Sequence, residues 1–226
     1  MTFSNPHLGV LVEMLETERA PSPEIVAFIL RRTPGAVVDV DDVRTVQAAI
    51  FWWRGFAGGA SFEAYLEAVP SAPARPVGPK YELRLLTLVD PRRGDSVSAA
   101  LLGQRGKFAL ADGQLRPFDR RHGIREDRPY WVSADDGSGN LWRPPEDCRQ
   151  ECTGLLHAGI LHVGIAIMVQ HGRRPHFMDL PGSVLVQDAR SSAYVGVWNE
   201  EITIGAHDDS VPSGNYGSVK FILEGT

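Results

Sequence analysis

Cysteine, lysine and long apolar runs are all scarce in this chain of 226 residues. The only two cysteines, Cys148 and Cys152, lie four positions apart and are too few for a disulfide framework. No apolar run approaches the roughly 20 residues that a membrane-spanning helix needs. The N-terminus lacks a basic segment followed by an apolar one, which a secretory signal would have. These absences predict a soluble protein of the cytoplasm.

An excess of positive charge is missing as well. The formal net charge is −5, which argues against nucleic acid or a membrane surface as a partner. Only Lys80, Lys107 and Lys220 among the 23 basic residues are lysines. Arginine codons are GC-rich and lysine codons are not, so this bias favours a GC-rich genome such as that of an actinobacterium.

Motifs that would identify a reaction are also absent. The chain contains no dinucleotide-binding fingerprint, no P-loop, no His-Glu-x-x-His and no Gly-x-Ser-x-Gly. We therefore assign no cofactor from the sequence. A hydrophobic content of 43% is nevertheless ordinary for a globular protein with a sizeable core.

The first part of the chain has the periodicity of short helices. Asn5 and Ser22 each precede a proline, the pattern of a helix cap followed by proline at the first helical position. Asp41 or Asp42 can cap a third helix that ends near residues 58–59, and Ser61 begins a fourth. Residues 1–69 are therefore predicted to form a bundle of short helices.

Four prolines occur between Pro70 and Pro79. Such a stretch favours extended polyproline II and acts as a semi-rigid spacer. It also resembles a ligand for an aromatic groove, but its position between two composition classes favours a linker. The predicted organisation is a helical module at 1–69, a linker at 70–79 and a strand-rich domain at 80–226.

After the linker the pattern becomes that of strands, bounded by turn residues. Strands come in runs with a helix pair inserted, which favours an α+β domain with a mostly antiparallel sheet. A hairpin is expected to join 130–134 to 140–142. The other expected strands are 81–89, 97–102, 107–110, 182–187, 194–198, 201–204 and 218–223, and the expected helices are 144–157 and 160–170.

Cys148, Cys152, His157 and His162 have the residue types of a zinc site. On a continuous helix the two cysteines share a face, but each step of five residues rotates the next histidine by about 140°. These four residues are therefore metal candidates only, and packing within a helix pair is the preferred interpretation.

His171, His176 and Asp179 form a second set, with His207 and the neighbouring Asp208 and Asp209 further along. Histidine and carboxylate side chains can bind a metal or transfer protons, and loops and helix ends often carry such residues. His171, His176 and Asp179 are the candidate catalytic residues. The competing interpretation is a set of solvated polar residues.

Arg120, Arg121 and Arg125 are candidate ligand-binding residues, because guanidinium groups suit phosphate and carboxylate. Acidic residues are interleaved with them at positions 119, 126 and 127. Local pairing on a solvated loop is the preferred interpretation.

Several short features between residues 130 and 183 occur in an order that resembles an uncharacterised actinobacterial family, domain of unknown function 5701. They are Tyr-Trp-Val at 130–132, Asp-Gly at 136–137, Pro-Glu-Asp at 145–147, Gly-Ile-Ala at 164–166 and Pro-Gly-Ser at 181–183. The N-terminal helices do not match that family. The resemblance implies an actinobacterial source and a related domain, and it assigns no catalytic residue.

The leading functional hypothesis is a non-catalytic protein whose strand-rich domain binds a small ligand or a partner. The N-terminal helices would then contact a protein partner. The alternative is a small hydrolase or metal-dependent enzyme built on His171, His176 and Asp179. An immunity or regulatory partner of another protein is a third hypothesis.

Overall fold

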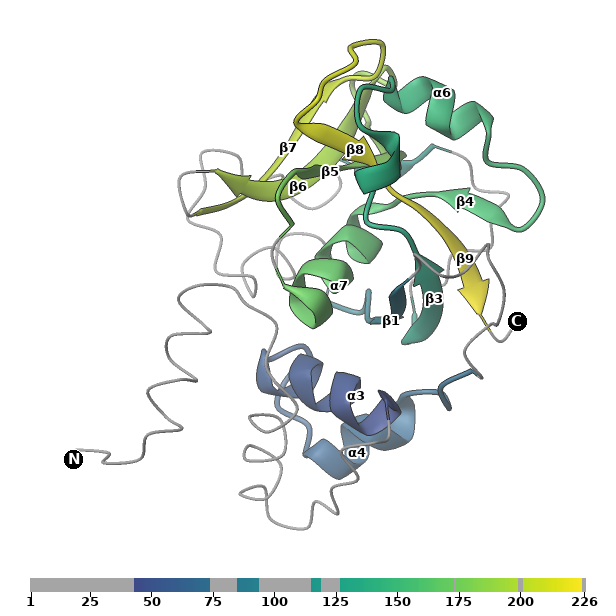
Figure 1. Cartoon of the computed structure of the whole chain (residues 1–226). Coiled ribbons are helices and arrows are strands. Elements are labelled where there is room, and N and C mark those ends of the chain that lie inside the picture. Colours follow the sequence, from purple (N-terminus) through teal and green to yellow (C-terminus); the bar gives the residue numbers. More distant parts are fainter. Residues whose placement is uncertain are drawn as a thin grey trace.

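The structure is a computed structural model that describes residues 43–73, 85–93, 115–118, 127–172, 174–198 and 201–224. The first two expected helices, the strands expected at 97–102 and 107–110, and the arginines at 120, 121 and 125 lie outside the described residues. The described part combines helices with two largely antiparallel sheets, so the predicted α+β class is confirmed (Figure 1).

The first sheet, sheet A, has four antiparallel strands in the order β1-β3-β9-β4. Its central strands come from distant parts of the chain, because β3 pairs with the C-terminal β9. Every residue of β3 is buried. The strands are β1 (Leu85–Val89), β3 (Tyr130–Ala134), β4 (Leu156–Ala158) and β9 (Lys220–Glu224).

The second sheet, sheet B, has the order β2-β5-β6-β7, with β8 beside β5. The pairing is antiparallel except between β5 and β8, which run parallel. The strands β5 and β6 begin several residues earlier than the sequence predicts. The bounds are β2 (Leu115–Pro117), β5 (Phe177–Leu185), β6 (Ser191–Trp198), β7 (Glu201–Asp208) and β8 (Tyr216–Ser218).

The helix α7 (Leu161–His171) lies in the middle of the molecule and packs against β1 of sheet A and β5 and β6 of sheet B (Figure 1). Nearly all its side chains are buried, which is why its sequence is apolar on every face. Gly164 lets the strands approach closely, because a Cβ there would lie within 3 Å of Leu180 and Val195 side-chain atoms. The predicted helix at 160–170 is confirmed.

The helices α3 (Val43–Trp53) and α4 (Phe62–Ala68) share one hydrophobic core with α7 and both sheets. Gln47 of α3 forms two hydrogen bonds with β1: its Nε2 donates to the Leu86 carbonyl at 2.8 Å, and its Oε1 accepts from the Leu88 amide at 2.7 Å. The side chain of Gln47 therefore pairs with β1 much as a neighbouring strand would, at the outer edge of sheet A.

The N-terminus of α4 is formed as the sequence predicts. Ser61 has an extended backbone, and its Oγ accepts a hydrogen bond from the Ala64 amide at 3.2 Å. This is a helix cap of the usual kind. The helix expected from Ser61 is thus confirmed. The helix expected before it is present as α3, but it ends at Trp53, because residues 54–59 form turns in which three glycines have positive φ.

Two local predictions between β3 and α7 are wrong. The helix α6 (Pro145–Gln150) ends well before His157, which lies instead in β4 and stacks on Phe221 at a ring-centroid distance of 5.1 Å. Residues 140–142 form no hairpin strand, because a 3-10 turn covers Ser138–Asn140 and Leu141 makes only an isolated bridge to Gly217. Long-range pairing with the C-terminal strands determines both outcomes.

Among the residues that the structure describes, no helix has both the length and the apolar character needed to cross a membrane.

Candidate functional site

A cavity of about 400 Å³ lies where the end of α4 meets the start of β3 and the end of β9. Small-molecule sites typically span about 300–1,000 Å³, so this volume suits a small organic molecule. The cavity is lined by residues 67–73, by residues 128–131, and by Leu223 and Glu224. One wall thus comes from the helical part and the first linker residues, and the other from sheet A.

Two side chains fix the helical wall of this cavity. Arg44 of α3 donates from Nη2 to the carbonyls of Leu66 at 2.6 Å and Val69 at 2.9 Å, and from Nε to Val69 at 3.0 Å. The last carbonyls of a helix have no partner within the helix, and a cation placed there also complements the helix dipole. The indole Nε1 of Trp131 donates to the Pro70 carbonyl at 3.0 Å. Residues 66–70 are therefore held from both sides.

The opposite wall is built by pairing between β3 and β9. Trp131 lies directly opposite Glu224, and Val132 lies opposite Leu223. Side chains of directly opposed residues project from the same face of a sheet. Trp131 is only 2% exposed, so its indole is packed behind this wall and offers little surface to the cavity. The cavity lining is therefore mixed, with apolar side chains such as Leu223 beside the charged Glu67, Arg128 and Glu224.

The carboxylate of Glu224 has an unsatisfied atom. Its Oε1 is buried and has no hydrogen-bond partner among the residues that the structure describes. Leaving a buried acceptor unpaired costs about 1–3 kcal/mol. Glu67 and Arg128, which also line the cavity, are exposed, and within the described part of the chain no ion pair joins Arg128 to either glutamate. The unpaired Oε1 is covered by protein atoms and lies behind the cavity wall, so it is not open to the cavity.

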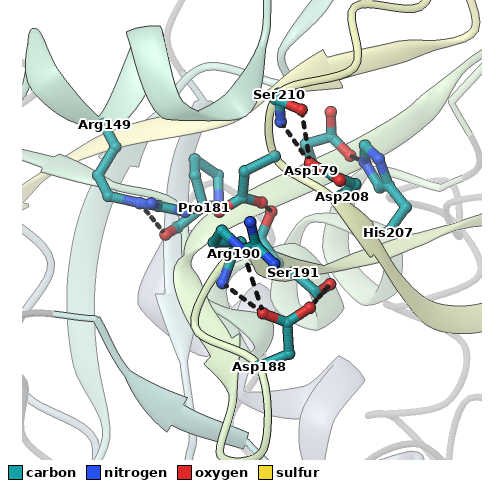
Figure 2. Close-up of polar contacts among 11 residues, drawn as sticks. Arg149, Asp179, Pro181, Asp188, Arg190, Ser191, His207, Asp208 and Ser210 are labelled. Atoms are coloured by element: carbon teal, nitrogen blue, oxygen red, sulfur yellow. Dashed lines mark hydrogen bonds and ion pairs between the residues drawn. The ribbon is translucent and has the colours of Figure 1, made fainter.

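A second group of polar residues lies on sheet B. His207 of β7 points toward Asp179 of β5, and its Nε2 is 2.6 Å from the Asp179 Oδ1 (Figure 2). The Asp179 side chain is 1% exposed and that of His207 is 21% exposed. A partly exposed imidazole oriented by a buried carboxylate can act as a general acid or base.

Aromatic rings surround this pair. Tyr216 stacks on Phe177 at 4.9 Å between ring centroids and lies 4.7 Å from the His207 ring, and Tyr194 packs edge-on against Tyr216 at 5.3 Å. The Tyr194 ring crosses Gly205, where a Cβ would come within 2.6 Å of it. The rings therefore fill the space over the strands by packing on one another.

The pKa values of the pair are both shifted upward. Burial raises the pKa of the Asp179 carboxyl, although the hydrogen bond from His207 opposes this rise. Burial alone would lower the pKa of His207, but the hydrogen bond and charge of Asp179, aided by Asp209 and the backbone of Asp208, raise it. Burial, together with the Tyr194 and Asp179 charges, raises the pKa of Tyr216 to about 12. The phenol therefore remains neutral at physiological pH.

Asp209 completes the polar group on sheet B. Its side chain is 3% exposed, forms an ion pair with Arg149 of α6 and accepts a hydrogen bond from the Ser192 hydroxyl. Arg149 also donates to the Pro181 carbonyl at 2.8 Å (Figure 2). These buried groups satisfy one another and tie α6 to β5, β6 and the end of β7.

The three residues predicted as catalytic have three different partners. The Nε2 of His171, at the end of α7, lies 3.0 Å from Thr87 Oγ1 on β1. The Nε2 of His176 lies 2.8 Å from the Asp136 carbonyl. Asp179 is bonded to His207, which the sequence suggested as a further member of the set. The structure thus joins Asp179 with His207 and gives His171 a partner on the other sheet.

The four predicted metal candidates lie on separate elements. Cys148 is in α6, Cys152 follows it, His157 is in β4 and His162 is in α7. Burial raises the pKa of both thiols, that of Cys152 to about 11, so both stay protonated at neutral pH. No group of three or more histidine, cysteine, aspartate or glutamate residues in the described ranges could hold a metal ion.

The residues that line the cavity were missed by sequence reasoning. The partners Trp131 and Glu224 are far apart in the chain, and Arg44 acts on backbone carbonyls that carry no side-chain signal. The one available clue was the linker itself, because Pro70 and Pro73 form part of the wall.

Comparison with protein-family models, with curated proteins and with solved structures finds no match to this chain, and the family resemblance over residues 130–183 stays a prediction.

Proposed function

We propose that this protein is a non-catalytic binding protein that holds a small organic molecule in the cavity between α4, β3 and β9. The observation that carries the proposal is the cavity of about 400 Å³, which places prolines 70 and 73 beside the exposed charged side chains of Glu67 and Arg128. A small ligand there would place a polar group near those charges while its apolar part packs against the prolines.

The position of the cavity supports a regulatory role for the ligand. One wall belongs to the helical part and the other to sheet A, so a bound molecule contacts both. Any ligand that binds only the folded arrangement stabilises it. Binding would therefore strengthen the contact between α4 and sheet A. A protein partner that contacts the N-terminal helices would then recognise this ligand-bound arrangement.

The proposal can be tested by following the protein by NMR while a set of small amines, alcohols and carboxylates is added. The indole N–H signal of Trp131, assigned with Trp131→Phe, reports on the hydrogen bond to Pro70. At least one probe should shift this signal and those of residues 67–73. Ala72→Leu, which fills the cavity, should weaken that binding at least tenfold.

Ala189→Leu is the matched control, because Ala189 is exposed and lies outside the cavity lining. It should leave the binding unchanged. Shifts that persist in Ala72→Leu, or a complete lack of shifts near the cavity, would contradict the proposal.

A second candidate function is acid–base catalysis on sheet B, for instance in a small hydrolase. It is favoured by the 2.6 Å contact between His207 and the buried Asp179. Hydrolysis of p-nitrophenyl acetate by the full chain, compared with His207→Gln and with His162→Gln as control, tests it. Equal rates in all three proteins would eliminate this candidate.

A further inference from the structure

Trp142, which lies between β3 and α6, is a large aromatic residue that the fold leaves at the surface. It is 73% exposed. Its φ of 65° makes it the only residue other than glycine with a positive φ in the described part of the chain. This conformation is unfavourable for a bulky side chain, so it persists only because the surrounding contacts impose it. The fold therefore holds this residue in place outside the core.

The contacts that hold Trp142 come from the turn before β8. The Trp142 amide donates a hydrogen bond to the Ser213 carbonyl at 3.0 Å. The indole lies against Gly214, where a Cβ would overlap the ring. The turn thus supports one side of the indole, and most of the ring remains open to a partner.

Three exposed carboxylates lie on the same two segments of chain. Glu146 and Asp147 are in the first turn of α6, and Asp208 ends β7. The Glu146 amide donates to the Asp209 carbonyl at 3.3 Å, so the start of α6 lies beside the end of β7. In the ranges that the structure describes, no ion pair joins any of the three carboxylates to a basic residue.

The basic side chains of this region already have acidic partners. The pairs are Arg143 with Glu151, Arg149 with Asp209 and Arg190 with Asp188. The exposed indole therefore lies in surroundings with an excess of negative charge.

We propose that the surface formed by Trp142, Glu146, Asp147 and Asp208 docks a basic segment of a protein partner. An arginine of the partner stacks on the indole, and neighbouring basic residues pair with the carboxylates. Tryptophan is the aromatic side chain that attracts cations most strongly, and the planar guanidinium suits stacking better than an ammonium group does. Tryptophan and arginine are both enriched in protein interfaces.

The charge of the surface favours this partner over others. An acidic segment would be repelled by the three carboxylates, and an apolar one would bury them without cations, which is costly. The net charge of −5 also favours the approach of a basic segment. The surface lies at the opposite end of the molecule from α3 and α4, so the proposal does not depend on the cavity (Figure 1).

The experiment titrates the full chain with hexa-arginine, hexalysine and hexaglutamate peptides at pH 7 and low salt. Dissociation constants are measured by NMR from the amide signals of residues 146–151 and 213–216. Hexa-arginine should bind most tightly, hexalysine severalfold more weakly, and hexaglutamate should leave these signals unchanged. Trp142→Leu keeps an apolar side chain but removes the aromatic face, and it should weaken hexa-arginine binding about fivefold. Asp147→Asn should weaken it about twofold.

Two matched controls remove comparable groups from other places. Leu155→Ala removes part of another apolar side chain, which is 78% exposed, and Glu63→Gln removes an exposed carboxylate on α4. Both variants should bind hexa-arginine as the wild type does, and urea unfolding establishes that every variant is folded. Equal hexa-arginine binding by Trp142→Leu and the wild type would refute docking through the indole. Hexaglutamate binding as tight as that of hexa-arginine would refute the preference for a basic partner.

Discussion

Asp209 directly follows β7 of sheet B and Glu224 ends β9 of sheet A, and the surroundings of these two acidic residues differ. Asp209 is paired with Arg149 and accepts a hydrogen bond from Ser192. Glu224 has a buried oxygen that no described residue satisfies. A carboxylate with protein partners contributes to holding elements together, whereas a buried oxygen without a partner lowers the stability of the fold. The following predictions test this distinction, beginning with the largest effect.

The largest effect is expected from Asp209→Asn. The substitution removes the negative charge beside Arg149, whose side chain is only 12% exposed, and leaves a nearly buried guanidinium without its counterion. Breaking one partner of a buried pair in this way costs about 3 kcal/mol. The free energy of unfolding in urea should fall by about that amount.

Asp208→Asn is the control for this substitution. Asp208 is the neighbouring residue but is exposed, and it bonds only locally with Ser210. Its replacement should change the free energy of unfolding by less than about 0.5 kcal/mol. Equal losses in both variants would mean that the Asp209 pair does not hold α6 to sheet B.

His171 should make the protein sensitive to acid. Burial lowers the pKa of His171 from 6.5 to about 4, with Arg174 contributing in the same direction. The unfolded chain therefore binds this proton more tightly, and stability falls as the pH drops from about 6.5 to about 4. At 1.36 kcal/mol per pKa unit, the full loss is about 3 kcal/mol.

The measurement is the free energy of unfolding between pH 7 and pH 4 for the wild type and for His171→Gln. Gln can retain a hydrogen bond to Thr87 and does not titrate, so its profile should be flatter over this range. Parallel profiles for the two proteins would contradict the predicted role of His171.

Glu224→Met should have the opposite sign from Asp209→Asn. It removes an unpaired buried oxygen and adds apolar contact, so the free energy of unfolding should rise by about 1 kcal/mol. The control is Glu151→Met, because Glu151 bonds to Lys220 at 2.7 Å and also to Arg143. That variant should be no more stable than the wild type. A loss of stability in Glu224→Met would show that the carboxylate has a structural role.

The smallest effect should come from His207 and appear on the alkaline side. Its pKa is raised in the folded protein by Asp179, despite the opposing effect of burial. A histidine of this kind contributes stability that is fully present below pH 6.5 and is lost as the pH rises through its folded-state pKa. His207→Gln should abolish this slight decline between pH 6.5 and 8 in urea unfolding. A decline of equal size in His207→Gln would assign it to another group.

Local sequence signals predicted the elements with strong periodicity or a defined cap. The helix from Ser61 has a cap that the sequence alone reveals, and the continuous apolar run of α7 suits a helix buried between two sheets. The strand β3 was likewise predicted from its apolar aromatic run. A helix or strand whose conformation depends on residues close to it in the chain can thus be predicted from the local sequence.

The failures share a different physical cause. His157 lies in a strand because β4 pairs with β9, and Leu141 is placed by Gly217, so neither conformation is determined locally. The cavity depends on the same kind of contact, since Trp131 and Glu224 meet only when β3 pairs with β9. Asp179 could be proposed from its residue type, but its bond to His207 depends on the register of three strands.

The contact between Gln47 and β1 bears on how the protein can be divided. A strand at the edge of a sheet exposes unpaired backbone groups, which serve as a template for pairing with another chain. In this protein the amide of Gln47 satisfies two of those groups on β1, and Gln47 lies on the N-terminal side of the linker. A truncated chain that starts at residue 80, where composition places the domain boundary, would lose this protection. Such a fragment should aggregate through β1, whereas a chain that retains α3 should remain monodisperse.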